Sequence, residues 1–132
     1  MSDKIRESTT TSFVRLEAAQ RGDLLFRNNV GVLKDLTGRP VRYGLANDTP
    51  AMNKVIKSSD LIGIHPLLIT QEMVGTVIGQ FLAIEMKEEG WVFNHLEREV
   101  AQKNFHDIVR KNGGRAGFAT CVADYRRIID RG

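Results

Sequence analysis

Residues 79–91, GQFLAIEMKEEGW, decide the expected fold because an apolar run here ends directly in charged residues. The β-branched and aromatic content of residues 76–87 predicts a strand. Side chains alternate along a strand, so Glu85 and Lys87 are expected on one face, about 6–7 Å apart. A buried charge without a partner costs several kcal/mol. This strand face therefore predicts an ion pair, a metal ligand or a substrate contact.

Helical and strand patterns alternate along the rest of the chain. Helices are expected at residues 5–21, 95–112 and 123–130. Strands are expected at residues 24–29, 41–45, 60–64 and 116–122, with a turn-rich connection at 30–40 and a loop at 46–59 that has room for a helical turn. This order predicts an α/β fold with a central mixed β-sheet flanked by helices.

The clearest helix, at residues 95–112, carries an apolar stripe at helical spacing. The stripe consists of Leu96, Val100, Ala101, Phe105, Ile108 and Val109. We expect this stripe to pack against the sheet.

The length of 132 residues predicts a single domain, 1–132. With 42% hydrophobic and 27% charged residues the composition is ordinary for a globular protein, and no apolar run approaches the roughly 20 residues that span a bilayer. The polar N-terminus lacks a signal-peptide core, so we expect a cytoplasmic protein without a membrane segment. The single cysteine, Cys121, cannot form an internal disulfide, and its apolar neighbours predict a place in the core.

Neither the charge nor the histidines identify a ligand. A net charge of +3 and a pI near 9.2 permit an anionic partner without requiring one. His95 and His106 would lie about 16 Å apart along one helix, and His65 precedes a proline in a loop. The three histidines therefore do not predict a zinc site.

Two carboxylates from neighbouring strands predict a metal site. A hard divalent cation such as Mg²⁺ takes oxygen ligands, and one carboxylate seldom suffices. Asp60 opens the strand before the one that carries Glu85, and adjacent strands lie about 4.8 Å apart. Lys87 would then orient or polarise the attacking water or a phosphate oxygen.

These residues belong to a longer pattern. In chain order it reads LFRNNVG (25–31), VRYGL (41–45), SSDLIGI (58–64), GQFLAIEMK (79–87), a helix with Gln102, and GGRAGFA (113–119). The pattern resembles the virus-type replication-repair nuclease (VRR-NUC) domain, a branch of the PD-(D/E)xK phosphodiesterase superfamily. The resemblance covers most of the chain and implies a restriction-endonuclease-like core. The polar segment 46–57 departs from the family, in which this part is often shorter and glycine-rich, and the departure bears on substrate contacts.

The resemblance assigns roles to residues of the second half of the chain and to Asp60. Asp60 and Glu85 would bind Mg²⁺, for which Mn²⁺ would substitute, together with the backbone carbonyl of Met86. Lys87 would be the catalytic lysine. The glutamine that family members carry on the following helix corresponds to Gln102, which would complete the catalytic set.

A glutamate on the first helix is a further metal-site residue in the family. It corresponds to Glu7, with Glu17 as the alternative. Ten helical residues separate these two glutamates by about 80° of rotation, so we do not expect both in one site.

The implied function is that of an Mg²⁺-dependent endodeoxyribonuclease, which hydrolyses phosphodiester bonds in DNA. Small members of the family resemble Holliday-junction resolvases, so we expect branched DNA as the substrate, a homodimer, and DNA repair in a bacterial or phage-infected cell. One alternative is a flap or nicking nuclease. Another is a non-catalytic nucleic-acid-binding module that has kept the nuclease fold.

Simpler interpretations of the same residues stay open. Glu85 and Lys87 would form a salt bridge at the end of a strand. Asp60 would organise a turn. Gln102 and Glu7 would be solvated helix residues, the latter favoured by the helix dipole.

Four residues are candidates for contact with nucleic acid. They are Arg27, Asn28, Asn29 and Lys103. The first three would either contact phosphates or build a turn at the end of a strand. Two aromatic residues after the charged strand, Trp91 and Phe93, would either cover the core or stack on a base.

Overall fold

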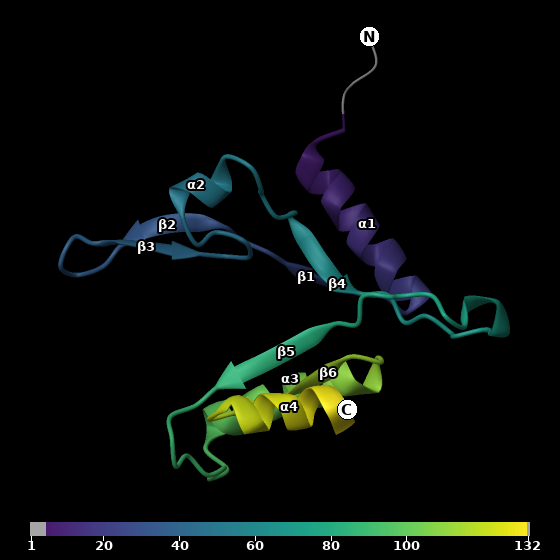
Figure 1. The fold of residues 1–132 in the computed structure, drawn as a ribbon. Coiled ribbons are helices and arrows are strands. Elements are labelled where there is room, and N and C mark those ends of the chain that lie inside the picture. Colours follow the sequence, from purple (N-terminus) through teal and green to yellow (C-terminus); the bar gives the residue numbers. More distant parts are fainter. Residues whose placement is uncertain (1–4, 132) are drawn as a thin grey trace. The chain divides into compact units, whose positions relative to one another are not determined.

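Four α-helices and six strands make up residues 5–131, the part of the chain that the computed structural model describes (Figure 1). The structure is mixed α/β, as the sequence predicts. The chain divides into two compact units, Met1–Gly63 and Ile64–Gly132, which are described in turn. The expectation of a single domain stays a prediction.

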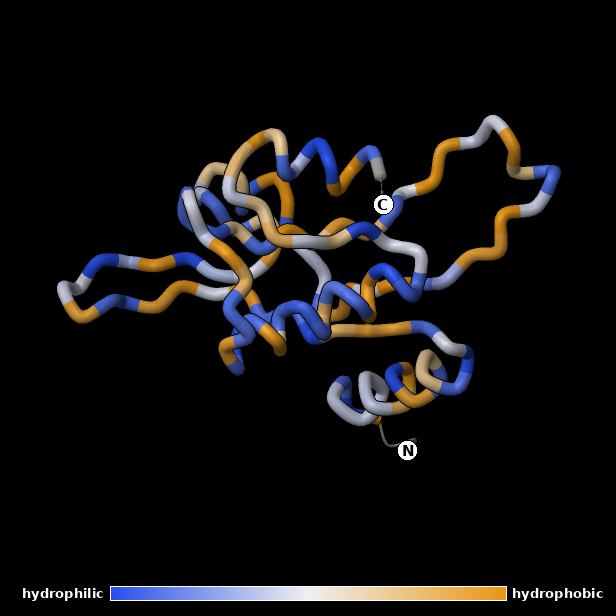
Figure 2. The backbone as a smooth tube through the Cα atoms, turned by 90° about the horizontal axis from the view of Figure 1, so that it is seen from below, coloured by the Kyte–Doolittle hydropathy of each residue, from blue (hydrophilic) through white to orange (hydrophobic). Residues whose placement is uncertain are grey.

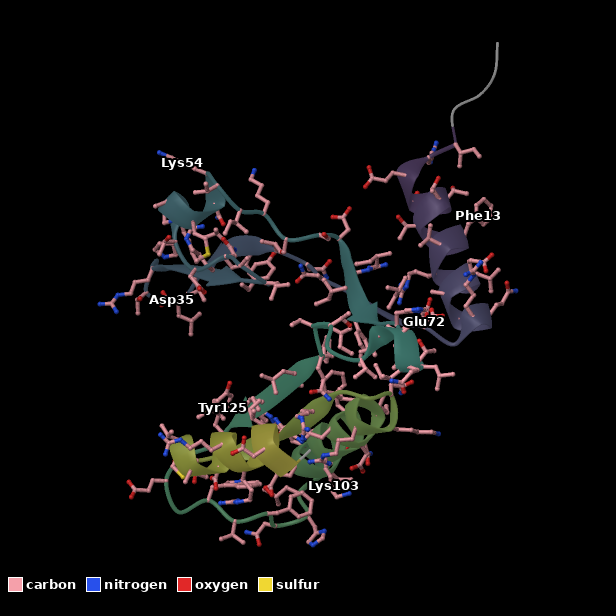
Figure 3. All side chains as sticks on the ribbon, turned by 45° about the vertical axis from the view of Figure 1, so that its right-hand side comes forward. Phe13, Asp35, Lys54, Glu72, Lys103 and Tyr125 are labelled. Carbon is pink, nitrogen blue, oxygen red and sulfur yellow. The ribbon has the colours of Figure 1, made fainter. Side chains whose placement is uncertain are left out.

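The first unit begins with α1, Glu7–Arg21, which confirms the first predicted helix. The helix ends at Gly22, whose φ of 85° lies in the left-handed region that glycine adopts without strain. The N–H of Asp23 then donates to the carbonyl oxygen of Ala18 at 2.9 Å. Phe13 is exposed on this helix (Figure 3).

Strands β1, Leu24–Arg27, and β4, Leu61–Ile64, pair as a two-stranded sheet. Both confirm predicted strands with shorter bounds. Gly63 lies so close to β1 that a Cβ atom there would collide with the carbonyl oxygen of Leu24. Glycine at this position is therefore required for the two backbones to approach.

A hairpin occupies residues 31–43, where the sequence predicted a turn-rich connection at 30–40 and a strand at 41–45, and its second strand confirms the predicted strand in part. Strands β2, Gly31–Lys34, and β3, Pro40–Tyr43, pair antiparallel. At the tip, Asp35 Oδ1 accepts hydrogen bonds from the N–H and the hydroxyl of Thr37 at 2.9 and 2.7 Å, and from the N–H of Arg39 at 2.9 Å. The hydrogen bond from the Thr37 hydroxyl is the main reason that the pKa of Asp35 is lowered. The prediction for residues 31–34 was wrong because turn residues at 35–39 close a hairpin rather than a long loop.

One short helix, α2, lies between this hairpin and β4. It covers Pro50–Asn53, and the Thr49 hydroxyl accepts the N–H of Met52 at 3.0 Å as its N-cap. The loop at 46–59 thus contains the helical turn that the sequence allowed.

The second unit contains a strand–helix–strand–helix sequence. Its elements are β5, Leu82–Met86; α3, Glu97–Lys111; β6, Arg115–Ala119; and α4, Val122–Arg131. Strands β5 and β6 are parallel, with Glu85 opposite Phe118. The helices and strands predicted for this part of the chain are confirmed, although β5 is shorter than expected and β6 ends at Ala119 rather than at residue 122.

The two helices of this unit cover opposite faces of the β5–β6 pair. On one face, the ring of Phe118 contacts His106 of α3, with ring centroids 4.7 Å apart. On the other face, a Cβ atom at Gly117 would lie 2.9 Å from Ile128 of α4. Because side chains alternate along a strand, neighbouring residues of β6 face different helices. Glu85, paired with Phe118, accordingly faces α3.

Helix α4 begins with a hydrogen-bonded cap. Asp124 Oδ2 accepts from the N–H and the hydroxyl of Thr120 at 2.8 and 2.9 Å, and Arg127 donates to Oδ1 at 2.8 Å. These bonds, those of Thr120 first, lower the pKa of Asp124 to about 2. Cys121, immediately before the helix, is exposed, so its predicted place in the core was wrong: it sits in the turn between β6 and α4 rather than in either element.

The predicted apolar stripe of α3 is not the face that is buried. The buried side chains of this helix are Glu99, His106 and Val109, whereas Leu96, Val100, Phe105 and Ile108 are exposed. Glu99 tolerates this burial because its Oε1 accepts the N–H of Asn94 at 2.8 Å. The predicted stripe was therefore wrong as a description of the buried face. Val109 is the one residue of the stripe that is buried.

One central sheet was predicted, but the strands of the described residues pair as three two-stranded sheets. Residues 65–81 separate β4 from β5 and contain a 3₁₀ turn, Gln71–Met73. The strand expected from residue 76 begins only at Leu82. Pro66 lacks an N–H for sheet pairing, and Gly75 adopts a φ of 89°. Figure 2 shows this segment as a largely hydrophobic stretch of backbone.

No helix in the described part of the chain is long and apolar enough to cross a membrane.

Candidate active site

Strand β5 and helix α3 bring Glu85 and Gln102 into contact. Gln102 Nε2 donates to Glu85 Oε1 at 2.9 Å, and both side chains are partly buried. This hydrogen bond does not involve the second carboxylate oxygen, Oε2. The amide thus holds one oxygen of the carboxylate and leaves the other available to a ligand.

The Lys87 ammonium lies beside two aromatic rings. Its Nζ atom is 5.4 Å from the ring centroid of Trp91 and 5.7 Å from that of Phe118. These rings are 4.7 Å apart, and Phe93 lies 6.0 Å from Phe118. Cation–π attraction favours this position of the ammonium. Lys87 therefore lies beside the rings of Trp91 and Phe118, and Phe93 extends this aromatic cluster.

Glu85 and Lys87 form no salt bridge with each other among the ion pairs of the described residues. The strand-end ion pair considered from the sequence is thus not what holds these charges. Glu85 takes its hydrogen bond from an amide, and Lys87 takes its contact from aromatic rings.

His106 lies one helical turn after Gln102 and is 3% exposed. Burial is the main cause that lowers its pKa, and the nearby guanidinium of Arg110 acts in the same direction. The carboxylates of Glu85 and Asp107 act in the opposite direction. The imidazole therefore favours its neutral form although it lies near a carboxylate.

An open pocket of about 350 Å³ lies beside this group of residues. It is lined by Glu85, Arg98, Ala101, Gln102, Phe105 and His106. The pocket gives a ligand access to Glu85 from the side of α3.

The other predicted metal ligands belong to the first unit. Asp60 is exposed directly before β4, and its carbonyl oxygen accepts the N–H of Asn28 at 2.8 Å. Glu7 is the exposed first residue of α1, whereas Glu17 forms an ion pair with Arg21 at 3.0 Å. Within residues 5–131, no three His, Cys, Asp or Glu side chains are grouped so that they could hold a metal ion. Joint roles for Asp60 or Glu7 with Glu85 stay predictions.

The residues predicted to contact nucleic acid differ in how they are held. Asn28 Nδ2 donates to the Ser58 hydroxyl at 2.8 Å and to the Ser59 carbonyl at 2.9 Å, while its Oδ1 accepts the N–H of Leu45 at 3.2 Å. This side chain ties β1 to the segment before β4. Arg27 and Asn29, on either side of it, are exposed.

Lys103 is exposed on α3 (Figure 3). Its Nζ atom lies 3.0 Å from Asp107 Oδ2, one turn along the helix. The hydrogen bond from Lys103 is the main cause that lowers the pKa of Asp107.

The second unit offers part of a ligand set for a hard cation. The available oxygen of Glu85 and the backbone carbonyl of Met86 are oxygen donors of the kind that Mg²⁺ and Mn²⁺ accept. The donor chemistry of these two residues therefore fits such a cation.

Comparison of this chain with family models, with curated proteins and with solved structures gives no significant match in any of the three. The likeness to the VRR-NUC domain thus rests on the residues that carry it.

Reasoning from the sequence missed one residue of this group, His106. The sequence feature that could have revealed His106 is its position four residues after Gln102, which places both side chains on the same side of a helix. The predicted apolar stripe instead placed the neighbouring Phe105, and not His106, against the sheet.

Proposed function

We propose that this protein is a metal-dependent DNA endonuclease with a PD-(D/E)xK-type core, selective for branched DNA and active as a homodimer. The observation that supports the proposal best is the hydrogen bond from Gln102 to Glu85. The resemblance to nucleases singled out these two residues for one site, although they lie on different elements. Lys87 follows directly after β5, and its N–H donates to the carbonyl oxygen of Ala119 at 2.9 Å.

In this proposal Glu85 and the Met86 carbonyl would hold Mg²⁺, and the resemblance implies Asp60 and Glu7 as further ligands. When bound, the ion would supply Lewis-acid stabilisation of the charge that develops on the phosphate. Gln102 keeps the Glu85 carboxylate oriented by occupying Oε1. Lys87 would donate a hydrogen bond to the attacking water or to a phosphate oxygen, from a position favoured by the rings of Trp91 and Phe118.

The exposed cations would contact the DNA backbone. Arg27 and Lys103 offer side chains that pair with phosphates, and Asn29 offers an amide. Contacts of this kind make binding depend on salt concentration and not on base sequence.

The proposal is tested by cleavage of end-labelled four-way junction, flap and plain duplex DNA with Mg²⁺, Mn²⁺ or EDTA. We expect paired, symmetric nicks in the junction that require the metal. Glu85→Gln and Lys87→Met should each lower the cleavage rate by about 100-fold or more. Glu88→Gln is the matched control, because it neutralises an exposed carboxylate in the same segment and should cleave normally.

Three results would count against the proposal in different ways. Full cleavage by both Glu85→Gln and Lys87→Met would refute the assigned site. Tight junction binding without any cleavage would favour the non-catalytic binding module. A monomeric mass in solution at micromolar concentration would refute the homodimer.

A further inference from the structure

Two buried polar atoms on the same side of α3 have no hydrogen-bond partner within residues 5–131. They are Gln102 Oε1 and His106 Nδ1. A buried polar group left unpaired costs about 1–3 kcal/mol. Two such atoms one helical turn apart, beside the only predicted carboxylate ligand of this unit, call for a physical explanation.

The chemistry of the two atoms is complementary. Gln102 uses its amide nitrogen for Glu85, so the atom that lacks a partner is the carbonyl oxygen, which needs a donor. An imidazole nitrogen is a donor when it carries the proton. Residues four apart on a helix are neighbours, and both side chains face the same carboxylate on β5.

We propose that His106 carries a proton on Nδ1 and donates it in a hydrogen bond to Gln102 Oε1, which makes His106 a positioning residue for Glu85. The result is a chain of donors that runs from His106 through Gln102 to Glu85.

This arrangement decides which way the Gln102 amide points. With its oxygen held by His106, the amide must direct its nitrogen to Glu85, as it does at 2.9 Å. A reversed amide would set a carbonyl oxygen against a carboxylate oxygen, which is repulsive. His106 donates from Nδ1 in both its neutral and its protonated form, so the positioning does not depend on the charge of the ring.

The surroundings of the ring fit a fixed imidazole. His106 is buried, and its ring packs edge-on against Phe118 at a centroid distance of 4.7 Å. Such packing restricts rotation of the ring, so that one tautomer keeps one direction. The hydrogen bond stands by itself, while the role of Glu85 as the positioned group rests on the proposed nuclease function.

The tautomer is measured directly by ¹⁵N NMR of the histidine rings in the full chain, without metal or DNA, at a pH where His106 is neutral. We expect the chemical shifts and two-bond couplings of His106 to show a protonated Nδ1 and an unprotonated Nε2. A protonated Nε2 with a bare Nδ1 would overturn the proposal. This measurement needs no catalytic activity, so its outcome is independent of the proposed function.

Two substitutions of similar size separate the position of the donor from packing. In His106→Asn the amide nitrogen takes the place of Nδ1, whereas in His106→Gln it reaches the place of Nε2. We expect Mn²⁺ binding, followed by calorimetry, to be retained in His106→Asn and to weaken about 10-fold in His106→Gln. Equal weakening in both variants would refute a specific donor at Nδ1.

A double-mutant cycle tests whether His106 acts through Gln102. In a Gln102→Leu background, exchange of His106 for Gln should no longer change Mn²⁺ affinity. Additive effects would show that His106 acts independently and would overturn the positioning role. If the natural chain bound no Mn²⁺ at all, the proposed metal site would fail, and the NMR measurement would still decide the hydrogen bond.

Discussion

Val109→Ala is expected to destabilise the second unit several times more than Val100→Ala. Both substitutions remove the same two methyl groups from α3. Val109 is 0% exposed and Val100 is 36% exposed. The sequence pattern of the helix places both residues in the same apolar stripe. The comparison therefore measures which side of the helix packs against the sheet.

The size of the effect follows from burial. Two fully buried carbon atoms contribute about 1.6 kcal/mol, and the cavity left behind adds about 1 kcal/mol. The helix propensity of alanine offsets about 0.5 kcal/mol, so we expect Val109→Ala to lower the free energy of unfolding by about 2 kcal/mol. At Val100 the side chain is partly in water and leaves no closed cavity, so we expect about 0.5 kcal/mol.

Urea unfolding followed by fluorescence is the suitable assay. The single tryptophan, Trp91, lies in the same unit as α3 and reports on its unfolding. Equal losses in the two variants, or a loss at Val109 below about 0.5 kcal/mol, would refute the assignment of the buried face.

Three further outcomes are expected. The pKa of Asp124 is lowered to about 2, so its contribution to stability is present above pH 3.8 and is lost as the pH falls through about 2; Asp124→Asn should remove this part of the acid-unfolding curve measured by circular dichroism. Gly63→Ala should disrupt the pairing of β1 with β4 in hydrogen exchange, whereas Gly79→Ala, where a Cβ atom meets nothing within 4 Å, should leave exchange unchanged. If the proposed function holds, Trp91→Leu should slow single-turnover cleavage about two- to five-fold, because it removes a cation–π neighbour of Lys87. Mg²⁺ binding should be unchanged, and an equal loss of Mg²⁺ affinity would contradict this prediction.

Elements with strong local signals were predictable from the sequence. Helix α1 ends where Gly22 allows a left-handed residue, and the strand around Glu85 follows from its apolar, β-branched composition. The contact of Glu85 with Gln102 joins two of the residues that the resemblance singled out. The strand face predicted for Glu85 and Lys87 stays a prediction, because β5 ends at Met86.

Features that depend on partners from elsewhere in the chain were not predictable. The buried face of α3 includes Glu99 and His106. Hydrophobic periodicity predicts that polar residues face the solvent, because it takes no account of what they contact in the folded chain. Burial of Glu99 is tolerated because its Oε1 accepts a hydrogen bond from the N–H of Asn94. Likewise, residues 76–81 have strand composition, but strand pairing needs a neighbouring strand as well as propensity.

The parallel pairing of β5 with β6 affects the order in which the second unit folds. Residues 87–114, including α3, separate the two strands, so the chain must close a long loop before the strands can pair. Contacts between α3 and β6 are closer in sequence and form at a lower entropy cost. We therefore expect β5 to join last, so that Glu85 meets Gln102 only when folding of the unit is complete.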